Sequence, residues 1–287
     1  MKKVILFTGL FCLLSFTFIS KKDKTPKGFI FVPSMTTDID GKAVSIQSFF
    51  MAEHEVTNHE YRDFLNHLKR DGKDSLYQLA YPDTAAWNIG NWHMQPMVDL
   101  YFWHPAYDNY PVVNITPEGA NLYCIWLTEQ LRETYSDRIN DVRLPTKYEW
   151  IGAAKGGLEN VIYPWSGPYL QNAKGCYLAN FTVIGDHNIQ RTKDGLVVVS
   201  DSTFVPDMSL IDGAITTAQS VSYSPNGYGL YNMSGNVAEL THEKIAMGGH
   251  WHSTGYDIRI TSEQAFEKAN PFTGFRPVMT YLKPSTK

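Results

Sequence analysis

The stretch from Asn226 to Glu239 constrains the fold of this chain more than any other part of its sequence. It reads NGYGLYNMSGNVAE, and its glycines are too closely spaced for a regular helix or strand. Glycine is used where the backbone φ angle is positive or where two backbones approach closely. Asn232, Asn236 and Glu239 place oxygen-bearing side chains between these turns. We therefore expect a winding segment whose oxygen atoms converge, which is how proteins hold hard cations.

Several other short motifs follow one another in a fixed order along the chain. They are Glu55-Val-Thr-Asn58 with Tyr61 and Phe64, Arg143-Leu-Pro-Thr-Lys-Tyr-Glu-Trp150, Tyr163-Pro-Trp165, Ala179-Asn180, Gly248-Gly249-His250-Trp251 and Gly274-Phe275-Arg276. Together with the glycine-rich stretch, this ordered set resembles the formylglycine-generating enzyme, or sulfatase-modifying factor, family over residues 28–282. The resemblance implies an irregular, loop-rich α+β fold that is related to C-type lectins.

The first twenty residues are typical of a signal peptide. Lys2-Lys3 supplies the positive charge, and residues 4–19 form an apolar run that is short for a membrane span. The cleavage site at Phe18-Ile19-Ser20 is imperfect, so an uncleaved segment that anchors the protein in a membrane stays open. We predict a signal peptide over residues 1–20, a linker over 21–27 and one sulfatase-modifying-factor-like domain over 28–287.

Composition and cysteine content narrow the function classes. The net charge is −4 and no basic run follows Lys27, so nothing indicates a nucleic-acid partner. Export would leave two cysteines, Cys124 and Cys176, and the sequence does not decide whether they pair. Cys124 shares a helical stripe with Ala120, Tyr123, Leu127 and Leu131, which predicts a buried thiol.

Three helix starts can be read from the sequence. Thr57 with Glu60, and Thr146 with Glu149, have the spacing of capping boxes. Thr116-Pro117-Glu118 combines a capping residue with proline at the first helical position. Residues 156–235 carry no long periodic run, and such a stretch is rare in a compact domain unless a ligand such as a metal orders it.

The resemblance implies two structural calcium sites in this loop-rich part. The first would use the Asn180 side chain, the Phe181 carbonyl, the Asp194 carboxylate and the Leu196 carbonyl. The second would use Asn232, the carbonyls of Gly235 and Val237, and Glu239. The alternative is that these asparagine and acidic side chains only form turns.

The family's catalytic machinery is not preserved in this chain. The family enzymes oxidise a substrate cysteine to formylglycine with a pair of cysteines, oxygen and a copper ion. Ser253 and Ile258 stand at the positions of that pair, His250 replaces the serine that normally follows Gly-Gly, and no cysteine follows Cys176. A hydroxyl does not replace a thiolate as a ligand for Cu(I). We therefore expect no formylglycine activity and no catalytic residues, which makes the chain a pseudoenzyme.

Two further features have open interpretations. His250 and His252 would lie on one face of a strand, where they could hold a transition metal, or they could simply pack beside Trp251. Residues 81–111 are rich in aromatic side chains, including Trp87, Trp92 and Trp103. These rings would either fill the core or form a surface that binds a peptide, a glycan or a protein partner.

Two function classes follow from the sequence. The first is an exported, non-catalytic binding or structural component of the cell envelope, similar to the gliding-motility and secretion-associated members of the family. Such a protein would lie in the periplasm, at the outer membrane or on the cell surface, with an envelope protein or complex as its partner. The second is a formylglycine-generating or related metal-dependent oxidoreductase, for which copper would be the cofactor. The partner, any substrate and the oligomeric state do not follow from the sequence.

Overall fold

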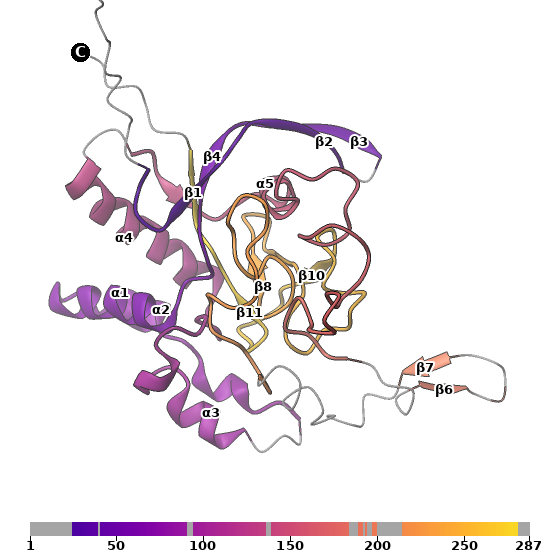
Figure 1. Ribbon diagram of the computed structural model, residues 1–287. Coiled ribbons are helices and arrows are strands. Elements are labelled where there is room, and N and C mark those ends of the chain that lie inside the picture. The colour runs from indigo at the N-terminus through magenta and orange to yellow at the C-terminus, as the bar shows by residue number, and fades with distance from the viewer. Residues whose placement is uncertain are drawn as a thin grey trace, which may run out of the picture.

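The fold was analysed in a computed structural model of the chain. It describes residues 25–39, 41–90, 94–135, 139–183, 189–191, 193, 197–199 and 214–280. Helices and strands alternate with long irregular segments, so the fold is α+β, as predicted. Figure 1 shows α1, α2 and α4 gathered on one side of the molecule, while the loop-rich C-terminal half lies on the other.

The helices lie mainly in the first half of the chain. They are α1 (Asn58–Arg70), α2 (Asp74–Ala80), η1 (Thr84–Trp87), α3 (Gln95–Leu100), η2 (Pro105–Tyr107), α4 (Pro117–Tyr135) and α5 (Lys147–Ala154). Both predicted capping boxes are confirmed: the Thr57 hydroxyl accepts from the Glu60 amide (3.2 Å), and that of Thr146 accepts from the Glu149 amide (3.2 Å). The third predicted start is confirmed as well, because the Thr116 hydroxyl accepts from the Gly119 amide at 3.1 Å.

In the described part of the chain, the named strands form two four-stranded sheets and two hairpins. The first sheet has the order β1 (Phe29–Val32), β4 (Phe49–Ala52), β12 (Val278–Thr280), β5 (Val142–Arg143). The second has the order β10 (Glu263–Ala265), β9 (Ile245–Met247), β8 (Ala238–Leu240), β11 (Thr273–Gly274). The hairpins are β2–β3 (Met35–Ile39, Lys42–Ile46) and β6–β7 (Ile189–Arg191, Val197–Val199). Among these named strands, every pairing is antiparallel except that of β8 with β11.

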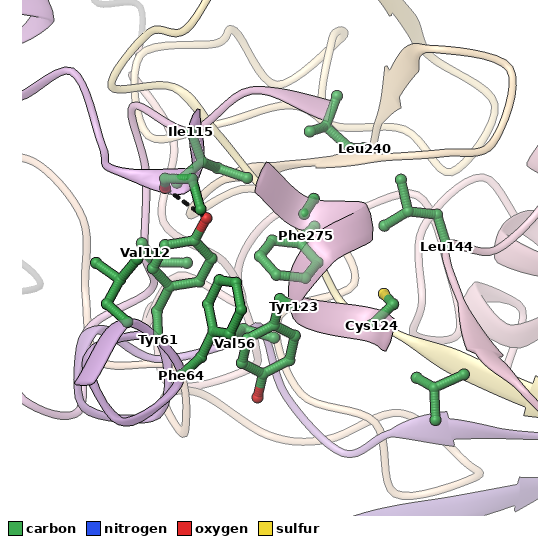
Figure 2. Close-up of a cluster of buried hydrophobic side chains, with 14 of the residues drawn as sticks. Val56, Tyr61, Phe64, Val112, Ile115, Tyr123, Cys124, Leu144, Leu240 and Phe275 are labelled. Atoms are coloured by element: carbon green, nitrogen blue, oxygen red, sulfur yellow. Dashed lines mark hydrogen bonds between the residues drawn. The ribbon is translucent and has the colours of Figure 1, made fainter. Parts of the chain in front are cut away.

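The first sheet is buried on both faces along its inner strand β4, whereas Phe31 on the edge strand β1 is 42% exposed. Along β4, Phe50 packs into one apolar cluster while Phe49 and Met51 pack into another. This is the period-two alternation of a strand, with both sets apolar because helices and loops cover both sides. The cluster beneath α1 and α4 is rich in aromatic rings, and Figure 2 shows Tyr61, Phe64, Tyr123 and Phe275 in contact there. The buried Tyr61 hydroxyl donates a hydrogen bond to the Ala80 carbonyl at 2.8 Å.

The remaining predictions on the fold can be compared with the structure. Cys124 is buried in this cluster with Ala120 and Tyr123, as the helical stripe predicted. Cys176 is exposed, and neither of these cysteines forms a disulfide. Most of the aromatic side chains in residues 81–111 fill the core, although Trp103 is 45% exposed; Trp92 lies outside the described residues. Within the part of the chain that the structure covers, no helix has the length and apolar character needed to cross a bilayer.

Candidate functional site

The glycine-rich stretch surrounds a buried acid, Glu55, which lies just before α1. The Asn236 amide nitrogen donates to one carboxylate oxygen of Glu55 (2.9 Å), and the Asn232 amide nitrogen donates to the other (3.1 Å). Both asparagines have positive φ angles, 51° at Asn232 and 61° at Asn236. Asparagine tolerates this left-handed conformation better than most residues, so the turns can aim both amides at one carboxylate.

A second buried acid, Glu239 on β8, lies close to Glu55. The Arg276 guanidinium donates to both of its oxygens at 2.7 and 2.6 Å, and the Trp150 indole adds a third bond at 2.7 Å. Arg276 also donates to the Tyr231 carbonyl at 2.7 Å. Glu239 and Arg276 are both fully buried, so each depends on the other for neutralisation.

The cluster holds two carboxylates against one guanidinium. Burial raises the pKa of Glu55 to about 8; Arg276 opposes this shift and Glu239 adds to it. Desolvation always disfavours the charged form of an acid, and a neighbouring carboxylate does so too. Any further positive charge at this place would favour the ionised form of Glu55.

Three asparagines tie a separate segment, residues 214–221, to this cluster. Asn180 donates to the Thr216 carbonyl (2.7 Å), Asn232 to the Ser220 carbonyl (3.1 Å), and Asn236 accepts from the Ala218 amide (2.7 Å). Side-chain bonds to backbone groups replace the missing secondary structure here, since buried peptide groups must be paired. The loop-rich half of the molecule is thus ordered by amide side chains as well as by apolar packing.

The structure brings residues of the two predicted calcium sites together. The Asn180 amide nitrogen donates to the Asn236 side-chain oxygen (3.2 Å), and the Asn180 carbonyl accepts from the Asn236 amide (2.8 Å). A Cβ atom on Gly235 would lie 2.2 Å from the Asn180 carbonyl oxygen, so only glycine fits there. Phe181 follows Asn180 directly, and Val237 lies between Asn236 and β8. Asp194 and Leu196 lie outside the described residues.

The positions predicted for a lost catalytic pair have other structural roles. The Ser253 hydroxyl accepts from the His250 amide (3.1 Å) and from the Gln264 side chain (3.2 Å). Ile258 is fully buried in an apolar cluster with Tyr163 and Phe181. Ser253 therefore stabilises a turn through hydrogen bonds, and Ile258 packs in the hydrophobic core.

His250 and His252 both stack on Phe272. Their ring centroids lie 4.5 and 5.9 Å from that of Phe272, and the His252 amide donates to Nδ1 of His250 at 3.1 Å. Burial, together with the nearby His252, lowers the pKa of His250 to about 3, so His250 is neutral at physiological pH. Residues 250–252 lie at a turn and not on a strand, which corrects the geometry expected from the sequence. Across the described residues, no three His, Cys, Asp or Glu side chains come together as a metal-binding group.

Comparison with known proteins identifies the family to which this domain belongs. The family model of the sulfatase-modifying factor enzyme 1-like domain matches residues 24–281. The chain belongs to the sulfatase-modifying factor family. Since the match covers nearly the whole described region, both the fold and the ordered motifs belong to this one domain type.

The curated relatives include active and inactive members of the sulfatase-modifying factor family. The formylglycine-generating enzyme of Mus musculus is 27% identical over 262 residues, which cover 82% of this chain and 58% of that protein. The inactive Cα-formylglycine-generating enzyme 2 of Bos taurus is 25% identical over 238 residues, which cover 76% of this chain and 65% of that protein. The chain thus spans somewhat under two thirds of the length of these relatives.

Solved structures show the same fold at low sequence identity. CarF superposes with a TM-score of 0.53 at 19% identity, covering 88% of this chain and 97% of its own. PvdO from Pseudomonas aeruginosa has a TM-score of 0.52 at 16% identity, covering 88% of this chain and 94% of its own. These similarities establish the fold and leave the chemistry to the site itself.

The residues of this family member differ in how well they suit the two metals that the family implies. Copper does not fit, because Ser253 and Ile258 offer no thiolate and both are already engaged. Calcium fits better: the side-chain oxygen of Asn232 is buried, and no described residue donates to it. Both Glu239 oxygens accept bonds from Arg276, so a calcium ion would have to share that carboxylate. The calcium sites therefore stay a prediction.

Sequence reasoning gave no role to the three residues that hold this cluster together. Glu55, Trp150 and Arg276 each belong to a motif that indicates the family, but none of these motifs assigns its residue to a charge cluster. One signal was available for Arg276, which stands in a mainly apolar stretch, because a buried charge needs an opposite charge. Glu55 follows Glu53 and His54, so its sequence neighbours do not mark it as buried. The sequence does not show which acidic side chain pairs with which basic one.

Proposed function

We propose that this chain is a non-catalytic member of the sulfatase-modifying factor family that works by binding. The observation that carries the proposal is the state of the two catalytic positions. Ser253 closes a turn through its hydroxyl, and Ile258 lies in the core. Neither can supply the thiolate that acts as nucleophile and metal ligand. The similarity to an inactive relative supports the same conclusion.

A direct assay tests this proposal. Purified protein is incubated with a cysteine-containing sulfatase peptide, copper and oxygen, and the peptide is analysed by mass spectrometry. An active formylglycine-generating enzyme serves as the positive control under the same conditions. We expect unmodified peptide with this chain. Formylglycine product would refute the proposal and favour the oxidoreductase alternative with its copper cofactor.

Export and a place in the cell envelope form the second part of the proposal. The charged and apolar pattern of residues 1–20 supports it, although this segment lies outside the described residues. Intact mass and cell fractionation of the native protein test it, with loss of about twenty residues expected. Cross-linking in envelope extracts would then identify a partner, including any gliding-motility or secretion complex. Full-length protein in the cytoplasmic fraction would contradict this part.

Calcium binding is the third part of the proposal. In the second site, the Asn232 side-chain oxygen, the carbonyls of Gly235 and Val237, and Glu239 would hold the ion. The buried side-chain oxygen of Asn232, to which no described residue donates, supports it, because a cation would satisfy that oxygen. A cation would also favour the ionised form of Glu55, whose pKa burial raises to about 8. The ion would supply structural rigidity, and the side chains would keep the loop carbonyls aimed at it.

The calcium proposal can be tested by thermal unfolding with calcium and with chelator. A ligand of the native state at about 100 times its dissociation constant adds about 2.7 kcal/mol of stability. In a domain of this size that is on the order of 5 °C in melting temperature. The control is exposed Glu267→Gln, which should keep the calcium response, whereas Glu239→Gln should reduce it. Equal melting temperatures with calcium and chelator would show that these loops are turns without metal.

A further inference from the structure

A large open cavity lies beside the turn that contains Ser253, in the loop-rich half of the molecule. Its volume is about 900 Å³, and it is lined by residues 168–173, Tyr177, residues 181–183 and residues 254–256. Ligand cavities usually have volumes of about 300–1,000 Å³, so this one can hold a ligand of several rings.

The walls of this cavity are fixed by specific contacts. The Trp165 indole donates to the Tyr169 carbonyl (2.8 Å), and the Tyr163 hydroxyl donates to the Gly255 carbonyl (2.8 Å). The rings of Tyr163 and Trp165 stack at 5.0 Å. A Cβ atom on Gly255 would lie 2.4 Å from a methyl carbon of Leu170, so the two walls meet closely there. A site held in this way loses little conformational entropy when a ligand binds.

Two tyrosine side chains at this cavity are largely exposed to solvent. Tyr169 is 75% exposed and Tyr256 is 67% exposed. The Arg259 guanidinium carbon lies 3.4 Å from the centre of the Tyr256 ring, and its Nε donates to the Tyr256 carbonyl (2.8 Å). One face of that ring is therefore covered and the ring is held in place, while the opposite face can stack on a ligand.

The chemistry of the lining selects a class of ligand. None of the described residues that line the cavity carries a charge. The polar groups are the carboxamides of Gln171 and Asn172 and the hydroxyls of Thr182, Thr254 and the tyrosines. The Asn172 oxygen accepts from two amides of its own hairpin (2.9 and 3.1 Å), so its amide nitrogen is the group that can donate to a ligand.

We propose that this cavity binds a neutral oligosaccharide. Tyrosine faces pack against the C–H faces of sugar rings, and carboxamides and hydroxyls match the sugar hydroxyls as donors and acceptors. The lining residues include no cation, and the Arg259 guanidinium beside them is already engaged with the ring and carbonyl of Tyr256, so the lining favours a neutral ligand. Binding of anionic sugars through Arg259 is the competing outcome of the test. The assignment gives a ligand class to the non-catalytic binding role proposed above, and it rests on that role.

The test uses the whole protein on an array of neutral and anionic oligosaccharides, followed by calorimetry with the neutral sugars that bind. We expect binding to at least one neutral sugar, and Tyr169→Ala and Tyr256→Ala should each weaken it about tenfold or more. Tyr148→Ala is the matched control, because Tyr148 is 43% exposed on α5 and does not line the cavity. Its affinity should equal that of the parent chain.

Four outcomes would overturn the assignment, of which three concern the sugars. They are no binding to any neutral sugar, binding to anionic sugars only, and neutral binding that neither tyrosine change weakens. A proline-rich peptide, the other ligand that aromatic grooves accept, is titrated in parallel, and its binding in place of a sugar would also overturn it. The peptide oxidation assay is independent of all these results. A chain that binds no sugar and makes no formylglycine therefore keeps its non-catalytic function and loses only this ligand.

Discussion

Removal of Arg276 provides the sharpest test of the buried charge cluster. In Arg276→Met, Glu239 would keep the Trp150 indole as a donor but would lose both guanidinium bonds, and Glu55 would lose its nearby positive charge. Loss of one partner of a buried ion pair costs about 3–5 kcal/mol, because the other charge stays behind without compensation. With a shift of about 2–4 °C per kcal/mol in a domain of this size, the melting temperature should fall by on the order of 10 °C.

Urea unfolding of two further variants separates this explanation from simple loss of packing. The double variant Arg276→Met with Glu239→Gln should be more stable than Arg276→Met alone, because glutamine leaves no unpaired charge at that position. Asp141→Asn removes the exposed pair between Arg132 and Asp141 and should cost less than about 1 kcal/mol. A loss below about 1 kcal/mol in Arg276→Met, or no recovery in the double variant, would refute the reasoning.

Three other predictions follow from the structure. Gly235→Ala should lower the free energy of unfolding in urea by about 1–3 kcal/mol more than Gly41→Ala does. Both glycines have positive φ angles, but only Gly235 lies against another backbone segment. Equal losses of stability in the two variants would contradict this prediction. In the folded protein, iodoacetamide should label exposed Cys176 and leave buried Cys124 unmodified until urea is added, as read by peptide mass spectrometry; rapid labelling of Cys124 would show that its cluster opens. Thr57→Ala should cost about 1 kcal/mol of unfolding free energy through loss of the α1 cap, and an unchanged midpoint in urea would argue against that role.

Local structure in this protein could be predicted from the sequence to a large extent. The helix starts at Thr57, Thr116 and Thr146 depend on contacts within one turn, and all three are present as expected. The buried stripe around Cys124 follows from helical periodicity in the same way. The ordered motifs gave the family and with it the α+β fold.

Long-range pairing could not be predicted in this way. Glu55 and Glu239 stand far apart in the sequence, and nothing local indicates that Arg276 binds Glu239 and lowers the pKa of Glu55. The irregular loops raise the same difficulty, because the bonds from Asn180, Asn232 and Asn236 to residues 214–221 leave no periodic pattern. The cavity could not be predicted for a related reason: Tyr169, Tyr177 and Phe181 meet Tyr256 across it, and the sequence does not show that these distant segments lie together.

The position of β12 near the end of the described chain sets the shortest time in which the first sheet can be completed during synthesis. This strand pairs with β4 on one side and with β5 on the other, so the first sheet stays incomplete until residues 278–280 have been made. At about 5–20 residues per second, the ribosome takes on the order of 10 to 50 s to pass from β4 to β12. During that interval β4 has one edge without its partner, and unpaired edges recruit other strands. The nascent chain therefore keeps one edge of β4 unpaired for far longer than its local helices need to form.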